Sequence, residues 1–413
     1  MINYFHRKYI LFLYIFSNVY LSYYFIKTGT LGGDFKHFFK TDPYIMSYSL
    51  ASVLLSLVFF CILFSLCSKV SFKIGLKYVE SYILDIIILS ITVLYMINTS
   101  IYSTGIAGVS VDDSGGNKFN FYFLSIFQPV YLIAIYLFYR IGNRNYFFNV
   151  ILVLYLITNI ISGQSAQLMW MGFLYLLYRY NIKKRSGYTQ IIFLSLVILL
   201  VSPFIRMAKF IFMQHAISGS NSLLTTANNY ILSYGNYLEA YFIFFNRTVE
   251  RFQQVANVQY IFENWFQLTE LLIANDYIPT FVNHWLIKFL IKVFHGDLSG
   301  NETIQSILAY HINGLTDWST QIGFVGYIPL LGLSFIGVFA IIIALVFASV
   351  ILSKVIDVNK TYIVELTWLL MVMFLFHGWF VPFLNYFQAL VFFITLIFTI
   401  RVSLDLMLYT RDH

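Results

Sequence analysis

The chain has 413 residues, of which 60% are hydrophobic, 20% are aromatic and only 10% are charged, and its mean hydropathy is +0.77. Because about a quarter of the residues in soluble domains are charged, this composition excludes a soluble domain and indicates an integral membrane protein. The net charge of +7 is then mainly a signal of membrane orientation and does not indicate a nucleic-acid partner.

Apolar runs of roughly 17 to 25 residues recur along the chain, and each is long enough for a helix to cross a bilayer. The first run follows Arg7 and Lys8, but it lacks a small-residue cleavage site, so we expect an uncleaved first helix. Cys61 and Cys67 share one predicted span, which gives neither a disulfide framework nor a metal-ligand spacing. About ten spans are expected, at Tyr9–Ile26, Tyr44–Cys67, Tyr82–Ile97, Phe121–Tyr139, Tyr146–Ile161, Ala166–Tyr178, Gln190–Phe204, Phe324–Leu352, Thr361–Phe376 and Phe387–Ile400. The sequence therefore predicts an all-α polytopic membrane protein.

Two apolar runs need a break. Basic residues at both ends of 146–178 predict a hairpin that turns at residues 162–164, because a single crossing would put one basic cluster on the far side. The run from Gly323 to Leu352 would be about 45 Å long as one helix, whereas the hydrocarbon core is roughly 30 Å thick. We expect tilt there, or a re-entrant start broken by the glycines and proline between residues 326 and 332.

Lysines and arginines cluster in alternate loops between the predicted spans, as they do on the cytoplasmic side of membrane proteins. The clusters are Arg7 with Lys8, Lys69 with Lys73 and Lys77, Arg140 with Arg144, Arg179 with Lys183, Lys184 and Arg185, Lys354 with Lys360, and Arg401 with Arg411. Both termini are therefore predicted to be cytoplasmic, and residues 1–413 to form a single membrane domain. Residues 206–321 would form one large outer loop with interfacial helices inserted in it.

One such helix is expected within Phe281–His295. Lys288 and Lys292 recur at helical spacing with His284 and His295, while apolar side chains fill the opposite face. This pattern is typical of a helix that lies in the membrane interface with a basic stripe toward water and headgroups. A helix packed on the membrane body with a solvated lysine face fits the pattern equally well.

Three arginines in the outer loop, Arg206, Arg247 and Arg251, run against the usual bias of basic residues toward the cytoplasm and therefore need a ligand. Arg247 and Arg251 are four residues apart on a predicted helix face, and their guanidinium groups can each make bidentate bonds to phosphate oxygens. Arg206 follows the seventh span, with Lys209 three residues on, at the depth of lipid headgroups. We expect these arginines to hold the diphosphate of a lipid-linked sugar.

Other interpretations of these arginines remain open. Arg206 could simply extend to the membrane interface. The other two could form structural ion pairs with nearby glutamates, namely Glu239, Glu250 or Glu263.

His311 precedes the point at which the chain returns to the membrane, just before Gly323 and Gly326. Glycines at that spacing let the backbone pass close to another element or to a ligand. A neutral imidazole there could accept a proton from a sugar hydroxyl, and Asp317 could orient it or act as the base itself. His377, at the outer end of the ninth span, is a second candidate. A loop histidine with a routine hydrogen bond is the alternative.

This layout resembles the Wzy-type O-antigen and capsular polysaccharide polymerases and the related O-antigen ligases. The shared features are about ten spans, as in GT-C-like folds, a large outer loop that carries arginines, and a His-Ile-Asn element before Gly323-Phe-Val-Gly326. The ligases have Asn, Ser or Gln after the histidine and place it one residue closer to the glycines. Ile312 and the longer spacing here disfavour a ligase.

The resemblance implies an enzyme of the bacterial cytoplasmic (inner) membrane that acts in polysaccharide or lipopolysaccharide biosynthesis. It would transfer a growing glycan from undecaprenyl diphosphate to the non-reducing end of a new lipid-linked repeat unit, at the periplasmic face. Its partners would be those lipid-linked oligosaccharides and the bilayer, with a chain-length regulator and a flippase as possible further partners. No metal and no nucleotide cofactor are expected, and the sequence lacks the short motifs that bind them. Arg206, Arg247 and Arg251 would hold the diphosphate, with Lys209, Lys288, Lys292 and His377 in support, and His311 or Asp317 would deprotonate the acceptor.

Two alternatives belong to other classes. A GT-C-type lipid-linked glycosyltransferase would use acidic residues of an early outer loop, for which Asp34, Asp112 and Asp113 are eligible. A lipid-linked oligosaccharide flippase or other transporter would hold ionisable residues inside the membrane, where Asp85 and Glu365 are the candidates. The large outer loop favours an enzyme.

Overall fold

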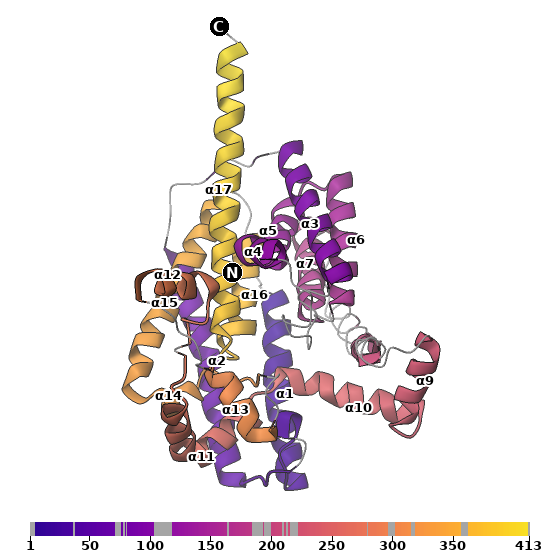
Figure 1. Ribbon diagram of the computed structural model, residues 1–413, viewed down its shortest axis with the longest axis vertical. Coiled ribbons are helices and arrows are strands. Elements are labelled where there is room, and N and C mark those ends of the chain that lie inside the picture. Colours follow the sequence, from indigo (N-terminus) through magenta and orange to yellow (C-terminus); the bar gives the residue numbers. More distant parts are fainter. Residues whose placement is uncertain are drawn as a thin grey trace. The chain divides into compact units, whose positions relative to one another are not determined.

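The computed structural model describes residues 5–35, 38–70, 76, 79, 81–102, 118–162, 165–183, 193, 200–208, 210, 211, 214, 222–278, 280–295, 302–314, 319–356 and 362–411. These residues are almost entirely helical, and no strand runs through them (Figure 1). The longer helices are α1 (Phe5–Thr28), α2 (Pro43–Lys69), α3 (Tyr82–Tyr102), α4 (Lys118–Phe127), α5 (Pro129–Arg140), α6 (Tyr146–Ile161), α7 (Ser165–Lys183), α9 (Leu223–Leu232), α10 (Tyr237–Val249), α11 (Val255–Ala274), α12 (Trp285–His295), α13 (Ile304–Asn313), α15 (Phe335–Ile356), α16 (Tyr362–Leu370) and α17 (Phe380–Arg411). Short helical turns are η1 (Gly33–Phe35), η2 (Glu250–Phe252), α14 (Tyr327–Leu331), η3 (Gly332–Ser334) and η4 (Met371–Leu375).

Within the described part of the chain, 6 helical stretches are long and apolar enough to cross a membrane. They are His6–Thr28, Pro43–Lys69, Tyr82–Ile101, Tyr122–Arg140, Tyr327–Ile356 and Phe380–Leu406, with two shorter apolar helices at Tyr146–Ile161 and Tyr362–Leu375. Each coincides with a predicted span, so the all-α membrane class is confirmed. The total of about ten spans stays a prediction, because most of the predicted seventh span, Gln190–Phe204, lies outside the described residues.

Both predicted breaks are present, and a third break was not predicted. α6 ends before residues 162–164 and α7 begins after them, as expected for the predicted turn. The long apolar run after Gly323 is interrupted at Gly332, where φ is +52° and α14 gives way to α15. The fourth predicted span consists of α4 and α5, which meet at Gln128 with a φ of 44°. Pro129 begins α5 because a proline has no N–H to donate to the preceding helix.

The chain falls into two compact units. The first unit comprises Met1–Leu21, Val93–Gly116 and Leu152–Gln253, and the second comprises Ser22–Thr92, Asn117–Ile151 and Gln254–His413. The segment 206–321, predicted as one outer loop, supplies α9 and α10 to the first unit and α11 to α13 to the second. A single membrane domain stays a prediction.

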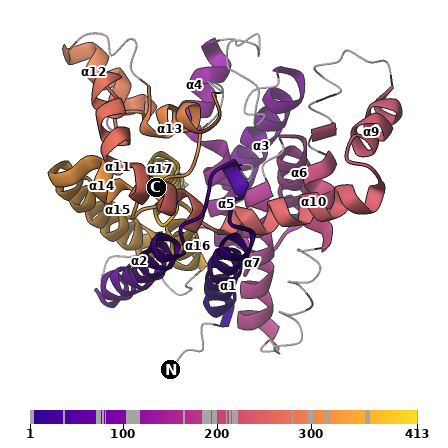
Figure 2. The same ribbon diagram turned by 90° about the horizontal axis from the view of Figure 1, so that it is seen from below.

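In the second unit, α2, α15 and α17 lie side by side (Figures 1 and 2). Asp42 caps α2, because its carboxylate accepts hydrogen bonds from the N–H groups of Tyr44 and Ile45. At the far end of α2, the ammonium group of Lys354 donates to the carbonyls of Ser68 and Val70, both at 2.6 Å. The ends of α2 and α15 that carry basic residues therefore lie together, as the alternating pattern of the clusters predicts.

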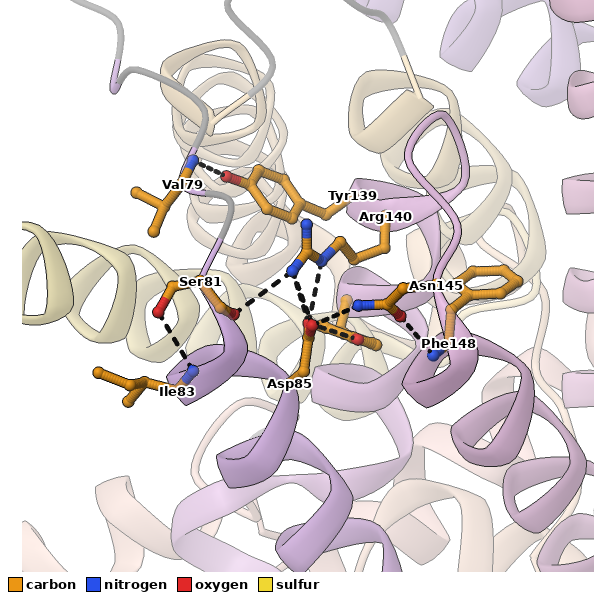
Figure 3. Close-up of polar contacts among 9 residues, drawn as sticks. Val79, Ser81, Ile83, Asp85, Tyr139, Arg140, Asn145 and Phe148 are labelled. Carbon is orange, nitrogen blue, oxygen red and sulfur yellow. Dashed lines mark hydrogen bonds and ion pairs between the residues drawn. The ribbon is translucent and has the colours of Figure 1, made fainter.

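A buried ion pair joins α3 to α5 (Figure 3). Nη2 of Arg140 lies 2.8 Å from both carboxylate oxygens of Asp85, and Nε lies 2.9 Å from one of them. The Tyr136 hydroxyl and the Asn145 amide also donate to this carboxylate, at 2.8 and 2.5 Å. Arg140, interpreted from the sequence as a cytoplasmic loop charge, is only 2% exposed. Burial is tolerated because both charges are paired and hydrogen-bonded.

Candidate functional site

Arg206 and Arg247 meet in the first unit, although 41 residues separate them in the sequence. Arg206 lies in the helical stretch 200–208, and Arg247 lies in the last turn of α10. An amino group of the Arg206 guanidinium donates a hydrogen bond to the backbone carbonyl of Arg247. The side chain of Asn236 caps the start of α10 by accepting from the N–H of Glu239 at 2.9 Å, which sets the helical register that places Arg247. Two of the predicted phosphate ligands are thus neighbours.

Arg247 rests on an aromatic bed, which we define as Tyr230, Tyr234 and Phe244. Its guanidinium carbon lies 5.1 Å from the ring centre of Phe244 and 5.7 Å from that of Tyr234, within the range of cation–π attraction. Phe244 is fully buried in a small apolar core with Met207. The hydroxyls of Tyr230 and Tyr234 share a hydrogen bond of 3.0 Å. The bed holds the guanidinium in place through its rings.

The hydroxyl of Tyr230 is a neutral hydrogen-bond donor in this environment. Burial raises its pKa, and its hydrogen bond with Tyr234 raises it further, while the charge of Arg247 and a hydrogen bond with Arg247 act in the opposite direction. The guanidinium beside it has only N–H donors, whereas the neutral phenol can donate or accept. The local chemistry therefore favours an anion with several oxygen acceptors.

The sequence left open that Arg247 and Arg251 form structural ion pairs with nearby glutamates. Within the described residues, neither Arg247 nor Arg251 forms an ion pair with a carboxylate. The carboxylate of Glu263, one of the proposed partners, instead accepts a hydrogen bond from the Gln259 amide at 2.6 Å. Arg247 is hydrogen-bonded to the Tyr230 side chain, and a guanidinium has five N–H donors, so its other donors could serve a phosphate.

Arg251 lies one turn beyond Arg247, in η2, and its side chain is exposed. The turn is anchored to α1, because the Asn18 amide donates to the carbonyl of Phe252 at 3.0 Å and the ring of Tyr14 packs edge-on against that of Phe252. Arg251 thus adds an exposed charge to the same part of the first unit. Lys209 lies outside the described residues.

In the second unit, the segment that begins at Gly323 runs beside the turn at His377. The N–H groups of Gly323 and Phe324 donate to the carbonyls of His377 and Phe376 at 3.2 and 3.0 Å. A Cβ on Gly323 would lie 2.8 Å from the Gln254 side chain, closer than ordinary contact. The predicted close approach of the backbone to another element is confirmed at this glycine.

His377 is buried, at 5% exposed, and its Nδ1 lies 2.7 Å from the amide oxygen of Gln321. The Tyr327 hydroxyl donates to the carbonyl of Gly378 at 3.1 Å and accepts from the Gln305 amide at 2.6 Å. His377 therefore belongs to a buried polar contact between the segment from Gln321 to Tyr327 and the turn at Gly378. This setting suits a positioning role better than direct contact with substrate.

His311 lies in the last turn of α13 and is exposed. Its ring centre is 6.3 Å from that of Tyr260 on α11, whose pKa is raised to about 12 by burial and then by Glu263. Gly314 ends α13 in the left-handed conformation, with a φ of 71°. His311 is thus open to a substrate at the end of a well-capped helix. Asp317 lies outside the described residues.

The helix predicted within Phe281–His295 is present as α12 (Trp285–His295). Lys288 and Lys292 are exposed, as expected, and so are Phe289 at 55% and Phe294 at 74%. Two exposed apolar residues of this size favour a helix in the membrane interface over one packed on the protein. His284, predicted to belong to the basic stripe, is instead buried at 3% exposed, because it lies ahead of α12 and faces α17.

Sequence reasoning missed the aromatic bed beneath Arg247. Tyr230 and Tyr234 are four residues apart, a spacing that places both rings on one face at the end of α9. In a chain with 33 tyrosines this signal does not stand out. Comparison of the chain with protein-family models, with curated proteins and with solved structures found no match.

Proposed function

We propose that this chain is a membrane-embedded glycosyltransferase that polymerises lipid-linked oligosaccharide repeat units, as the Wzy-type polymerases do. The observation that carries the proposal is the contact of Arg206 with Arg247 above the aromatic bed, outside the apolar spans of a membrane protein. Arg206 and Arg247, neighbours through the backbone of Arg247, suit a diphosphate, which offers several charged oxygens at once.

The reaction forms a bond between a hydroxyl oxygen of the acceptor sugar and the anomeric carbon of the donor glycan. It breaks the bond between that carbon and the diphosphate of undecaprenyl diphosphate, which leaves with the bonding electron pair. Arg206 and Arg247 stabilise the negative charge that develops on the leaving group, and Arg251 adds to the local positive potential. The sequence assigns the deprotonation of the acceptor to His311 or Asp317, and His311 is exposed at the end of α13.

The ion pair of Asp85 argues against the transporter alternative. A transporter needs an intramembrane charge that can bind and release its cargo. Asp85 instead accepts hydrogen bonds from Arg140, Tyr136 and Asn145, which is the pattern of a structural contact.

The test is an assay of the purified protein in lipid nanodiscs with a synthetic undecaprenyl-diphosphate-linked repeat unit. We expect products of increasing repeat number and the release of one undecaprenyl diphosphate for each new glycosidic bond. Unchanged substrate, or transbilayer movement of the substrate without elongation, would contradict the proposal.

A further inference from the structure

A groove runs along α2 in the second unit, with a volume of about 860 Å³. It is lined by α2, by Phe262 and Trp265 of α11, and by the chain from Phe324 to Pro329 that leads into α14. The lining is mainly aromatic and aliphatic. None of the residues proposed above to hold the diphosphate or to act as the base lines this groove.

The groove is long and follows the direction of a membrane-crossing helix. Its lining on α2 extends from Tyr44, next to the helix start, to Phe59. At 1.5 Å per residue this is roughly 22 Å, which is more than half of the roughly 30 Å hydrocarbon core. The groove therefore begins at one end of the span and continues well into the depth at which lipid chains lie.

The walls are held by side-chain packing. Phe324 stacks on Phe59 with ring centres 5.8 Å apart, and Phe262 packs against Tyr48 at 5.4 Å. The Ser56 hydroxyl donates to the carbonyl of Val53 at 2.7 Å, so it does not need a polar ligand. An apolar and preformed surface of this kind binds an apolar chain at little cost in ordering.

The wall on α2 belongs to Pro43–Lys69, and Ile328 and Pro329 belong to Tyr327–Ile356, both stretches apolar enough to cross a membrane. A groove with this apolar lining suits an apolar chain better than a peptide or a sugar. The starting end of α2 is also the end at which Tyr260 and His311 lie, because Tyr260 packs on Phe35 of η1, shortly before α2. A chain in the groove would place its headgroup beside the candidate base.

We infer that the α2 groove binds the isoprenoid chain of the lipid carrier, with the carrier's phosphate end toward Tyr44. This inference rests on the proposed function, because that function supplies an isoprenoid-linked substrate. The groove then guides the substrate within the membrane, while the sugar-transfer chemistry takes place at its headgroup.

The test is photo-crosslinking with benzoyl-phenylalanine in place of Tyr48, in protein reconstituted into phospholipid with a small fraction of polyprenyl phosphate. The matched control is the same replacement of Phe398 on α17. Both native side chains are aromatic and exposed, at 65% and 56%, but only Tyr48 lines the groove. Adducts are identified by mass spectrometry as polyprenyl phosphate or phospholipid.

We expect the ratio of polyprenyl to phospholipid adducts to be about tenfold higher at Tyr48 than at Phe398, which corresponds to a specific site. Ser52→Phe, which fills the groove, should abolish this enrichment at Tyr48 and leave the adducts at Phe398 unchanged, which also reports that the variant is folded. Equal ratios at the two positions would mean that bulk lipid alone fills the groove, and would overturn the inference.

The sugar-free probe separates this inference from the proposed function. Enrichment at Tyr48 in a protein that does not elongate glycans would refute polymerisation and leave the isoprenoid site in place. Elongation without enrichment would refute the site alone.

Discussion

An arginine held by aromatic rings differs in its chemistry from one held by a carboxylate. Rings attract the cation by about 0.5 to 2 kcal/mol without occupying its charge-assisted hydrogen bonds, whereas a carboxylate uses them. Arg247 belongs to the first kind, since Phe244 and Tyr234 lie beneath it. Under the proposed function, this setting leaves Arg247 suited to a phosphate.

Arg247→Ala should lower the initial rate of elongation by about 100-fold to 1000-fold, the usual effect of removing one donor from a developing anion. Arg247→Lys keeps the charge but loses the planar fork, so it should recover only part of the rate. The measurement is the release of undecaprenyl diphosphate. The matched control is Arg401→Ala, because Arg401 is partly exposed and only 3.8 Å from Asp405 in a weak pair. Equal rates for both alanine variants would remove Arg247 from the site.

His284 should make stability depend on pH. Burial lowers its pKa below the ordinary value near 6.5, and the neighbouring Gln388 and Asn385 only partly oppose this. Folding therefore favours the neutral imidazole of His284. The stability that this imidazole contributes is fully present above its pKa in the unfolded state, and it is lost as the pH falls through its lower pKa in the folded state. Between about pH 7 and about pH 5.5, the thermal midpoint of the wild type in detergent should fall more than that of His284→Gln. If the thermal midpoints of the two proteins fall in parallel with pH, His284 does not titrate as a buried group.

At the scale of helices, the Asp85–Arg140 pair fastens the start of α3 to the end of α5. Opposite charges at these ends also suit the helix dipoles, since Asp85 lies in a first turn and Arg140 in a last turn. Asp85→Asn should cost about 3 to 5 kcal/mol of stability, because it leaves a buried guanidinium without its counter-charge. Asp405→Asn, which breaks the exposed pair with Arg401, should cost at most about 1 kcal/mol. Denaturant titration in mixed micelles measures both, and similar losses would contradict the structural role of Asp85.

The turn at Gly378 needs both an unusual backbone and empty space. Its φ is +77°, and a Cβ there would lie 2.7 Å from a ring carbon of Tyr327. Gly314 has a similar φ of +71° but nothing within 4 Å of that position. Gly378→Ala should therefore lower the thermal midpoint clearly more than Gly314→Ala, which bears only a backbone strain of about 1 kcal/mol. If the two variants melt together, the contact with Tyr327 is not tight.

Sequence patterns predicted these elements well where the cause is local. The 3.6-residue period predicted α12, and the glycines and proline of residues 326–332 predicted the interruption at Gly332. The break at Pro129 was not predicted, although the missing N–H of proline explains it. Burial of Arg140 could not be predicted, because its partner lies 55 residues away and only packing brings the two together. The same holds for the 41 residues between Arg206 and Arg247. Charge bias pointed to both arginines, but nothing local indicated that they touch.

At the level of the whole molecule, the lysines near the two ends of α2 allow its orientation in the membrane to be tested. Lys69 and Lys354 lie at one end of α2 and α15, and the turn that carries Lys40 precedes the other end of α2. We expect the Lys69 end to face the cytoplasm. In a variant without Cys61 and Cys67, a membrane-impermeant maleimide should label Lys40→Cys in intact spheroplasts, and Lys69→Cys only after permeabilisation. The reverse pattern would invert the proposed orientation.

Polymerisation by this protein should be visible in the surface glycan of cells that lack it, resolved by repeat-unit number. We predict a single-repeat product in place of a ladder, restored to a ladder by the wild-type chain and not by Arg247→Ala. Complete loss of surface glycan, with lipid-linked repeats held at the cytoplasmic face, would contradict the claim and indicate a flippase, while incomplete repeat units would indicate a glycosyltransferase that assembles the unit itself.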